Sequence, residues 1–168
     1  DNRIYHHTNA GVIHKNRGDV SGNVIYSNQL GVRLDDSFGG EVYNNHIYAN
    51  VAQGILVRSS TGGSTRAIFN NTVDQPQGDA IRVENGAQNV DLRNNILSVQ
   101  SGYAISVAAD SQVGFTSDYN LLHFTASGKL ALWEGQDLLT RADWFYTLGF
   151  DEHGRTSDPQ FVNPAGSD

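Results

Sequence analysis

Asparagine recurs along this chain at intervals of 22 to 26 residues, and aliphatic residues keep fixed offsets from it. The anchors of the repeat are Asn23, Asn45, Asn71, Asn95 and Asn120. An aliphatic residue stands two positions after every anchor, and another stands three positions before each of the first four. A third stands nine or ten positions after each of the first four. A period of this length, built from short apolar segments, is typical of a solenoid whose neighbouring coils bury a shared core.

Each repeat contains three short segments in which apolar and polar residues alternate, as at residues 54–58. Such alternation is typical of a β-strand, and no repeat has the apolar stripe of a helix. Three strands in each repeat indicate a parallel β-helix, in which equivalent residues of neighbouring coils lie about 4.8 Å apart. Crossovers between parallel strands favour the right hand. We therefore expect an all-β fold, a right-handed parallel β-helix of about six coils, with its coils over residues 1–124.

The asparagine column has a structural explanation. An inward Asn at a tight bend can hydrogen-bond through its side-chain amide to the next Asn in the stack, which forms a ladder along the solenoid. Asn also tolerates the unusual backbone dihedral angles of such a bend. Small residues form a second column just before the third strand, where a sharp bend fits: Gly11, Gly31, Gly54, Ala80 and Ala104. We interpret both columns as structural.

Residues 125–168 depart from the repeat and form a C-terminal extension rich in aromatic residues. Thr140 and Asp143 have the spacing of a capping box, with Asp in place of the usual Glu. They predict a short α-helix over residues 141–148 that ends at Gly149. Residues 158–162 then indicate a turn into a return strand. We expect the extension to pack on the side of the solenoid or to cover its end.

The chain begins inside a repeat, and its last residues stop without a closing element. We interpret the chain as a piece of a longer protein that continues into further coils. The alternative, a complete small protein, leaves an unpaired sheet edge at the open end of the solenoid.

The composition excludes several classes of partner. The net charge is −7, so a phosphate-binding surface is not expected and nucleic acid is not a predicted partner. No run of about 18 apolar residues is present, so no membrane span is predicted. The absence of Cys excludes a disulfide framework and thiolate metal sites.

Two repeats resemble those of the right-handed parallel β-helix in pectate-lyase-like proteins: residues 44–47 with 54–57, and residues 94–97 with 104–107. The C-terminal part looks like the C-terminal signature of secreted bacterial β-helix proteins, on residues 117–121, Trp144, Gly149, Asp151 and 158–162. The resemblance implies a polysaccharide-associated protein that is secreted or lies at the cell surface. It does not fix the activity, because the superfamily includes lyases, hydrolases, epimerases, esterases, phage tailspikes and adhesins.

The motifs that would settle an activity are mostly absent. The Asp-Pro-His motif of alginate epimerases is missing, because Gln160 follows Asp158 and Pro159. Of the polygalacturonase set, only the paired Asp35 and Asp36 is found. A polysaccharide lyase or glycoside hydrolase therefore stays open beside a non-catalytic carbohydrate-binding, adhesive or structural solenoid.

One outward column on the third strand of the repeat alternates in charge, with Lys15, Asp35, Arg58 and Glu84. Opposite charges on neighbouring strands attract, so the column can be a ladder of ion pairs worth about 0 to 1 kcal/mol each. The alternative is a groove for an acidic polysaccharide, with these four residues as candidate catalytic groups. Lys15, or an Arg of lowered pKa, would then remove the proton alpha to the sugar carboxylate.

Arg33 and Arg82 are candidate substrate-binding residues, because Arg binds a carboxylate with two parallel hydrogen bonds and these two stand near the same column. Ca²⁺ is the cofactor that the groove would take, with hard oxygen ligands from Asp35, Asp36 and Glu84. In a hydrolase, Asp35 or Asp36 would form a carboxylate pair with Glu84, which lies two coils and about 10 Å away.

Tyr5, Tyr26 and Tyr48 share a different outward column, three residues after successive asparagines of the repeat. Tyr26 and Tyr48 are candidate substrate-binding residues, because a row of aromatic rings can hold sugars. The alternative is a well-packed strand face. We predict a β-helix module that acts on or binds an acidic polysaccharide, and the sequence names neither the sugar, nor the bond broken, nor the oligomeric state.

Overall fold

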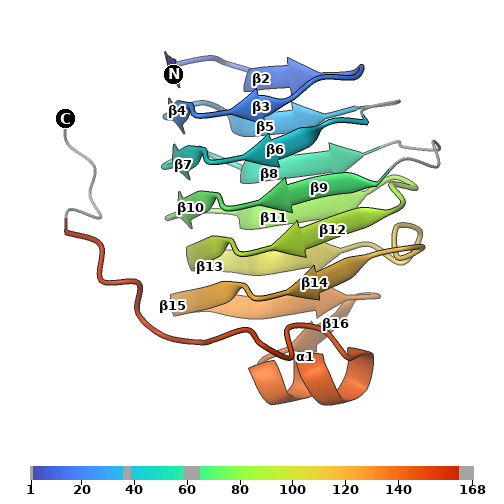
Figure 1. Ribbon diagram of the computed structural model, residues 1–168. Helices are drawn as coiled ribbons and strands as arrows, with labels where there is room; N and C mark the ends of the chain where they lie inside the picture. The colour runs from blue at the N-terminus through green and yellow to red at the C-terminus, as the bar shows by residue number, and fades with distance from the viewer. Residues whose placement is uncertain (1, 36–38, 59–64, 163–168) are drawn as a thin grey trace.

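A computed structural model of the chain describes residues 2–35, 39–58 and 65–162. The chain forms a parallel β-solenoid in which each coil lies directly on the one before it (Figure 1). The predicted fold class is confirmed. Among the described residues, the first coil has strands on two of the three faces, so the solenoid makes about five complete turns rather than six.

Three stacks of parallel strands form the three faces of the solenoid. The first, which we call the tyrosine face, contains β1 (Arg3–Tyr5), β4 (Val24–Tyr26), β7 (His46–Tyr48) and β10 (Thr72–Gln75). The second, the charged face, contains β2 (Ala10–His14), β5 (Leu30–Leu34), β8 (Gln53–Arg58) and β11 (Asp79–Glu84). The third face contains β3 (Val20–Ser21), β6 (Glu41–Tyr43), β9 (Arg66–Phe69), β12 (Val90–Arg93) and β14 (Thr116–Asp118).

Two long strands join the tyrosine face to the charged face. β13 (Ile96–Val107) and β15 (Leu121–Trp133) each run along the first face, bend and continue along the second. The coils therefore extend through Trp133, past residue 124. The register between coils places like residues on top of one another, as with Ile25, Ile47 and Val73. All three are fully buried, so the aliphatic columns form the apolar core that the repeat predicts.

The asparagine ladder forms inside the bend before the tyrosine face. In each step, Oδ1 of one Asn accepts hydrogen bonds from both the backbone N–H and Nδ2 of the Asn in the preceding coil. The distances between these atoms lie between 2.9 and 3.2 Å from Asn23 to Asn120. The anchors are almost fully buried, so each amide is satisfied by its neighbour rather than by water.

Asp151 ends the ladder, which the repeat did not predict. Its Oδ1 accepts hydrogen bonds from Asn120 N (3.1 Å) and Nδ2 (2.9 Å), as an anchor would. Its Oδ2 accepts from Ser117 Oγ and from Trp144 Nε1. An ionised carboxylate accepts hydrogen bonds and donates none. The ladder can therefore end at Asp151, because this side chain, unlike that of Asn, has no N–H group that needs an acceptor in a further coil.

A second, shorter ladder runs through the next bend, between the tyrosine face and the charged face. Asn28 donates its backbone N–H and Nδ2 to Asn50 Oδ1, each at 3.0 Å. Asn50 N donates in turn to Gln75 Oε1 at 3.0 Å. All three side chains are buried. The two ladders fix both ends of the strands on the tyrosine face.

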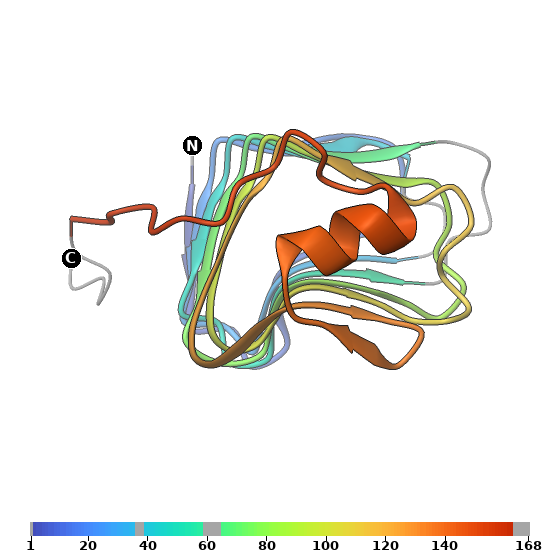
Figure 2. The same cartoon turned by 90° about the horizontal axis from the view of Figure 1, so that it is seen from below.

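The C-terminal extension covers the end of the last coil. β16 (Gln136–Leu138) pairs antiparallel with β15, and α1 (Arg141–Leu148) lies across the solenoid end (Figure 2). The predicted helix is confirmed, including its capping box at Thr140 and Asp143 and its end at Gly149, where φ is 75°. Trp144 is the buried residue of the helix and contacts the rings of Phe115, Trp133 and Phe150.

The segment after the helix replaces the expected return strand. It runs back beside β15 through a single parallel bridge between Leu121 and Arg155. Residues 158–162 form no strand, because Pro159 has no N–H to donate and Gln160 has a φ of 54°. We call residues 155–162 the tail. Its end passes the outer side of the tyrosine face rather than adding to the sheet (Figure 1).

Candidate functional site

On the charged face, the residues of the predicted groove lie side by side but pair with one another. Arg33 Nε lies 2.9 Å from Asp35 Oδ2, and Arg58 Nε lies 3.4 Å from Asp35 Oδ1. Arg82 Nε lies 2.6 Å from Glu84 Oε2. Arg58 with Asp35 joins two neighbouring coils of the column, whereas Arg33 with Asp35 and Arg82 with Glu84 pair within one coil. A sugar carboxylate would compete with these protein carboxylates for the guanidinium groups.

The same pairs determine what this face can do chemically. The hydrogen bond from Arg82 to Glu84 raises the pKa of Arg82, which takes that Arg further from the role of a base. Lys15 follows β2 and is exposed. Asp35, in contrast, is buried. The catalytic roles of Lys15, Asp35, Arg58 and Glu84 stay predictions.

Asp35 and Glu84, two candidate ligands of the predicted Ca²⁺ site, lie on different coils. Glu84 pairs in register with Arg58, and Arg58 stands between it and Asp35 along the column. Asp36 lies outside the described residues. Within the part of the chain that the structure describes, no group of three or more His, Asp or Glu side chains is placed to hold a metal ion. The Ca²⁺ site stays a prediction.

The tyrosine face carries the aromatic column. Tyr5, Tyr26 and Tyr48 stand in register on β1, β4 and β7. Their rings stack with centroids 5.1 and 5.0 Å apart and with planes 20° and 0° apart. Exposure decreases along the stack from 47% at Tyr5 to 9% at Tyr48, against which His46 also packs. Because the rings cover one another, the column presents ring edges to the outer surface more than open ring faces.

The column continues with polar residues in the next three coils. Asp74 pairs in register with Tyr48, Ser98 with Asp74, and His123 with Ser98. The rule that found the tyrosines, three residues after an asparagine of the repeat, also gives these three positions. Sequence reasoning missed them because it followed one residue type and not the column.

These polar residues line a pocket that the tail closes on its outer side. Asp74, Ser98 and His123 form the floor, with Gln100 and Thr125 beside them. The opposite wall is formed by residues 158–161 of the tail, and the pocket has a volume of about 200 Å³. Seen from the solenoid end, the tail leaves the last coil on the side of the tyrosine face (Figure 2). The flat column therefore leads into a concave, polar site.

Asp74 has the most unusual environment on this face. It is 7% exposed, and its burial in the sheet surface raises the pKa of its carboxyl above the ordinary value. A hydrogen bond with Ser98 and the nearby His46 and His123 oppose this shift without cancelling it. A buried carboxyl with a raised pKa is typical of sites that transfer protons.

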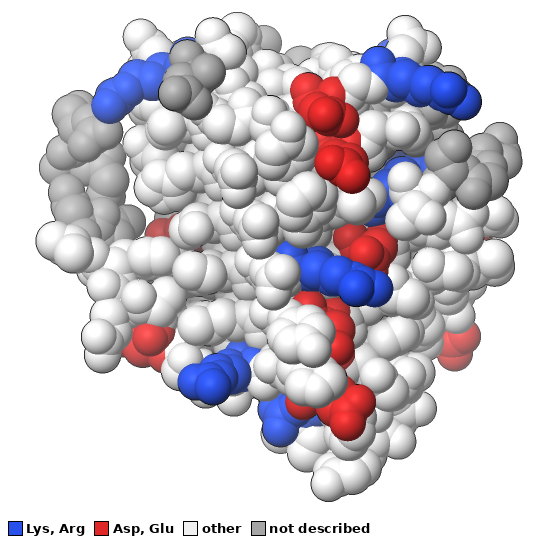
Figure 3. Space-filling view, in the orientation of Figure 1, with Lys and Arg blue, Asp and Glu red and all other residues white. Residues whose placement is uncertain are grey.

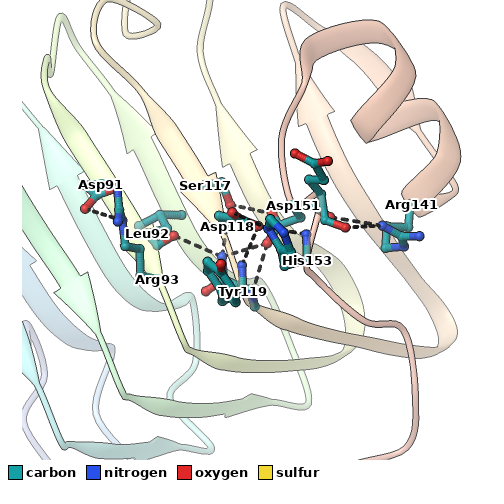
Figure 4. A network of polar contacts seen from close by, with 11 residues as sticks. Asp91, Leu92, Arg93, Ser117, Asp118, Tyr119, Arg141, Asp151 and His153 are labelled. Carbon is teal, nitrogen blue, oxygen red and sulfur yellow. Dashed lines mark hydrogen bonds and ion pairs between the residues drawn. The ribbon is translucent and has the colours of Figure 1, made fainter.

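A second polar cluster joins the last coil to residues 151–153, which lie between α1 and the tail (Figure 4). His153 Nδ1 lies 2.9 Å from Asp118 Oδ2, and the imidazole stacks on Tyr119 with centroids 4.6 Å apart. The hydrogen bond with Asp118 raises the pKa of His153. His153 N also donates to Asp118, and Arg141 donates to the carbonyl of Asp151. These bonds hold the 151–153 segment in place, so we interpret the cluster as structural.

The third face, seen in Figure 3, carries acidic and basic groups in alternation over its described part. Asp91 pairs with Arg93 there, at 2.9 Å. No basic surface of the kind that binds phosphates stands out in this view. Among the described residues, the single helix α1 is too short to cross a membrane.

The stacked coils and the buried ladder define a β-helix protein, and comparison with known families agrees. Residues 1–126 match the family described as a right handed beta helix region. Since the match covers three quarters of the 168 residues, the chain belongs to this family. No curated protein and no solved structure matches the sequence. Family membership therefore gives the fold and its hand, and the activity has to be argued from the surface.

Proposed function

We propose that this β-helix binds a neutral polysaccharide along the tyrosine face. The observation that carries the proposal is one continuous column, in which three stacked tyrosines lead to the polar residues of a pocket. Sugars are recognised by apolar ring surface together with a few placed hydrogen-bonding groups. The column offers aromatic ring edges and polar side chains in a line parallel to the solenoid axis, so it fits a linear chain. The proposal includes the secreted or cell-surface location that the family resemblance implies.

Charge favours a neutral sugar over the acidic polysaccharide that the sequence predicts. The pocket is lined by Asp74 and Asp158, and no Lys or Arg stands among its described lining residues. The guanidinium groups of Arg33 and Arg82 are engaged by carboxylates on the other face. A net charge of −7 repels a polyanion from the molecule as a whole.

Binding to a panel of polysaccharides tests the proposal. Affinity electrophoresis of the 168-residue chain would use soluble xylan, galactomannan and mixed-linkage glucan beside polygalacturonate and alginate. We expect retardation by at least one neutral polymer. Replacing the central ring, Tyr26→Ala, should weaken binding about tenfold, which is about 1.4 kcal/mol and within the range of an aromatic anchor.

Tyr43 provides a matched control for the loss of a stacked ring. It stacks on Phe69 with centroids 5.1 Å apart, but on the third face. Tyr43→Ala should leave binding within about twofold of the parent. Equal losses in Tyr26→Ala and Tyr43→Ala would mean that the substitutions act through stability. Binding confined to the acidic polymers would overturn the proposal and return the search to the charged face.

A further inference from the structure

We propose that the pocket at the end of the tyrosine column is a hydrolytic site for the bound glycan, in which Asp74 is the general acid and His123 is the general base. This inference rests on the proposed function, because the tyrosine column is what would deliver the sugar chain to the pocket. Beyond binding, it assigns a reaction, two catalytic residues and the place along the tyrosine column at which the sugar chain is cleaved.

The spacing of the two residues suits a displacement by water. Asp74 and His123 occupy the same column two coils apart, with Ser98 between them. At about 4.8 Å for each coil, their backbones are about 10 Å apart. Hydrolases that invert the anomeric carbon place their two groups about 6.5 to 9.5 Å apart to leave room for a water molecule. Both residues line the same pocket, and two coil spacings place them close to the upper end of this range.

The surroundings of Asp74 equip it to carry a proton. The carboxyl lies on β10 and is nine-tenths buried, and desolvation raises its pKa. The groups that face it are His46 on β7, Ser98 on β13, His123 on β15 and Asp158 on the tail. Ser98 and the two imidazoles limit the rise of the pKa of Asp74.

The reaction balances with water as the only co-reactant. Asp74 gives its proton to the glycosidic oxygen while the bond from that oxygen to the anomeric carbon breaks. The oxygen of a water molecule forms the new bond to the anomeric carbon, and His123 takes the proton that the water loses. The products are a new reducing end and a free hydroxyl. Loss of the proton from His123 and its uptake by Asp74 from solvent restore the site.

Elimination is the less suitable reaction for this pocket. A lyase must neutralise the carboxylate next to the carbon that loses its proton, which requires a cation or an oxyanion-type site. The described residues of the lining include no Lys or Arg, and two of them, Asp74 and Asp158, are acids. The pocket therefore favours hydrolysis of a neutral sugar over elimination from a uronate.

The test is the release of reducing ends from each polymer that the chain binds, with absorbance near 235 nm read in parallel. We expect reducing ends without the absorbance of an unsaturated uronate. Asp74→Asn keeps the shape and removes the proton, so it should lower the rate at least about 100-fold while binding is retained. His123→Asn should cause a loss of similar size. The rate should also fall as the pH rises through the raised pKa of Asp74 and the carboxyl loses its proton.

Asp91→Asn is the matched control, because Asp91 is a carboxylate in an ion pair on the third face, away from the pocket. It should leave the rate unchanged. Binding without any release of reducing ends would overturn the hydrolytic site and leave the proposed binding function intact. Hydrolysis that survives both Asp74→Asn and His123→Asn in folded protein would overturn the assignment of residues. Absence of binding to every polymer would remove the proposed function, and this inference with it.

Discussion

The tyrosine face and the charged face are neighbouring surfaces of the same coils, yet they use their polar groups in opposite ways. On the charged face, Asp35 lies between Arg33 and Arg58, so opposite charges satisfy one another. On the tyrosine face, Asp74 is buried beside Ser98 without an Arg or Lys in the described lining of its pocket. The ion pairs of the charged face therefore fit a structural role, whereas the buried Asp74 at the pocket marks the candidate site.

The asparagine ladder supports both faces. A substitution at its end, Asp151, should therefore lower the stability of the whole solenoid and cause the largest change among those predicted. In Asp151→Asn the amide oxygen can still accept from Asn120, but the amide nitrogen replaces the oxygen to which Ser117 and Trp144 donate. Buried donors would then face a donor, and we expect the free energy of unfolding to fall by about 3 kcal/mol or more. Urea unfolding followed by circular dichroism measures it. Glu152→Gln, at the exposed neighbouring position, should change it little, and similar losses in both variants would contradict the role of Asp151.

The next largest effect should appear on the charged face alone. Asp35→Asn removes the buried carboxylate that two guanidinium groups share, and it should lower the free energy of unfolding by about 2 kcal/mol. Asp91→Asn breaks the more exposed pair with Arg93 on the third face and should lower it by less than about 1 kcal/mol. Thermal unfolding of both variants at equal concentration makes the comparison. If Asp35→Asn leaves stability unchanged, the charged face is not held by its ion pairs.

On the tyrosine face, the corresponding substitution should act in the opposite direction. Because burial raises the pKa of Asp74 above the ordinary 3.8, the folded chain holds more protons than the unfolded chain between the ordinary value and the raised one. Stability therefore falls as the pH rises through that window, and at about pH 7 the buried carboxylate opposes folding. Asp74→Asn should unfold at the same or a higher urea concentration than the parent at about pH 7. A clear loss of stability would show that Asp74 supports the fold.

The smallest effect concerns salt. Binding of a neutral polymer to the tyrosine face should change less than about twofold between about 0.05 and 0.5 M NaCl, because no ion pair forms. Binding of an acidic polymer to Arg residues of the charged face would weaken steeply over the same range. The affinity at each salt concentration, measured by calorimetry, separates the two faces.

Most of the fold could be predicted because it is periodic. The spacing of the asparagine column predicts the length of each coil. The capping box at Thr140 and Asp143 predicts the residue at which α1 begins. Asp151 could not be predicted, since it joins the ladder from outside the repeat after a helix has intervened. The contact forms because the chain returns to the last coil after α1. The spacing of residues within the repeat does not indicate where this return places Asp151.

The candidate site was predicted only in part. The repeat placed Tyr26 and Tyr48 in one column, and their rings stack with centroids 5.0 Å apart. Their role in binding a substrate stays a prediction. Asp74 and His123 stand three residues after an asparagine of the repeat, as the tyrosines do. The pocket that they line is completed by the tail, which the repeat does not predict. The ion pairs of the charged face could be predicted as a column, whereas the burial of Asp35 between two guanidinium groups required the structure.

A map of the residues that contact the glycan distinguishes the tyrosine face from the charged face directly. Amide NMR spectra of the 18.3 kDa chain, titrated with an oligosaccharide from the polymer it binds, would provide it. We predict that the largest chemical-shift changes lie in β4, β7 and β10 and in the tail beside the pocket. Changes confined to β5, β8 and β11 would place the sugar on the charged face and contradict the account.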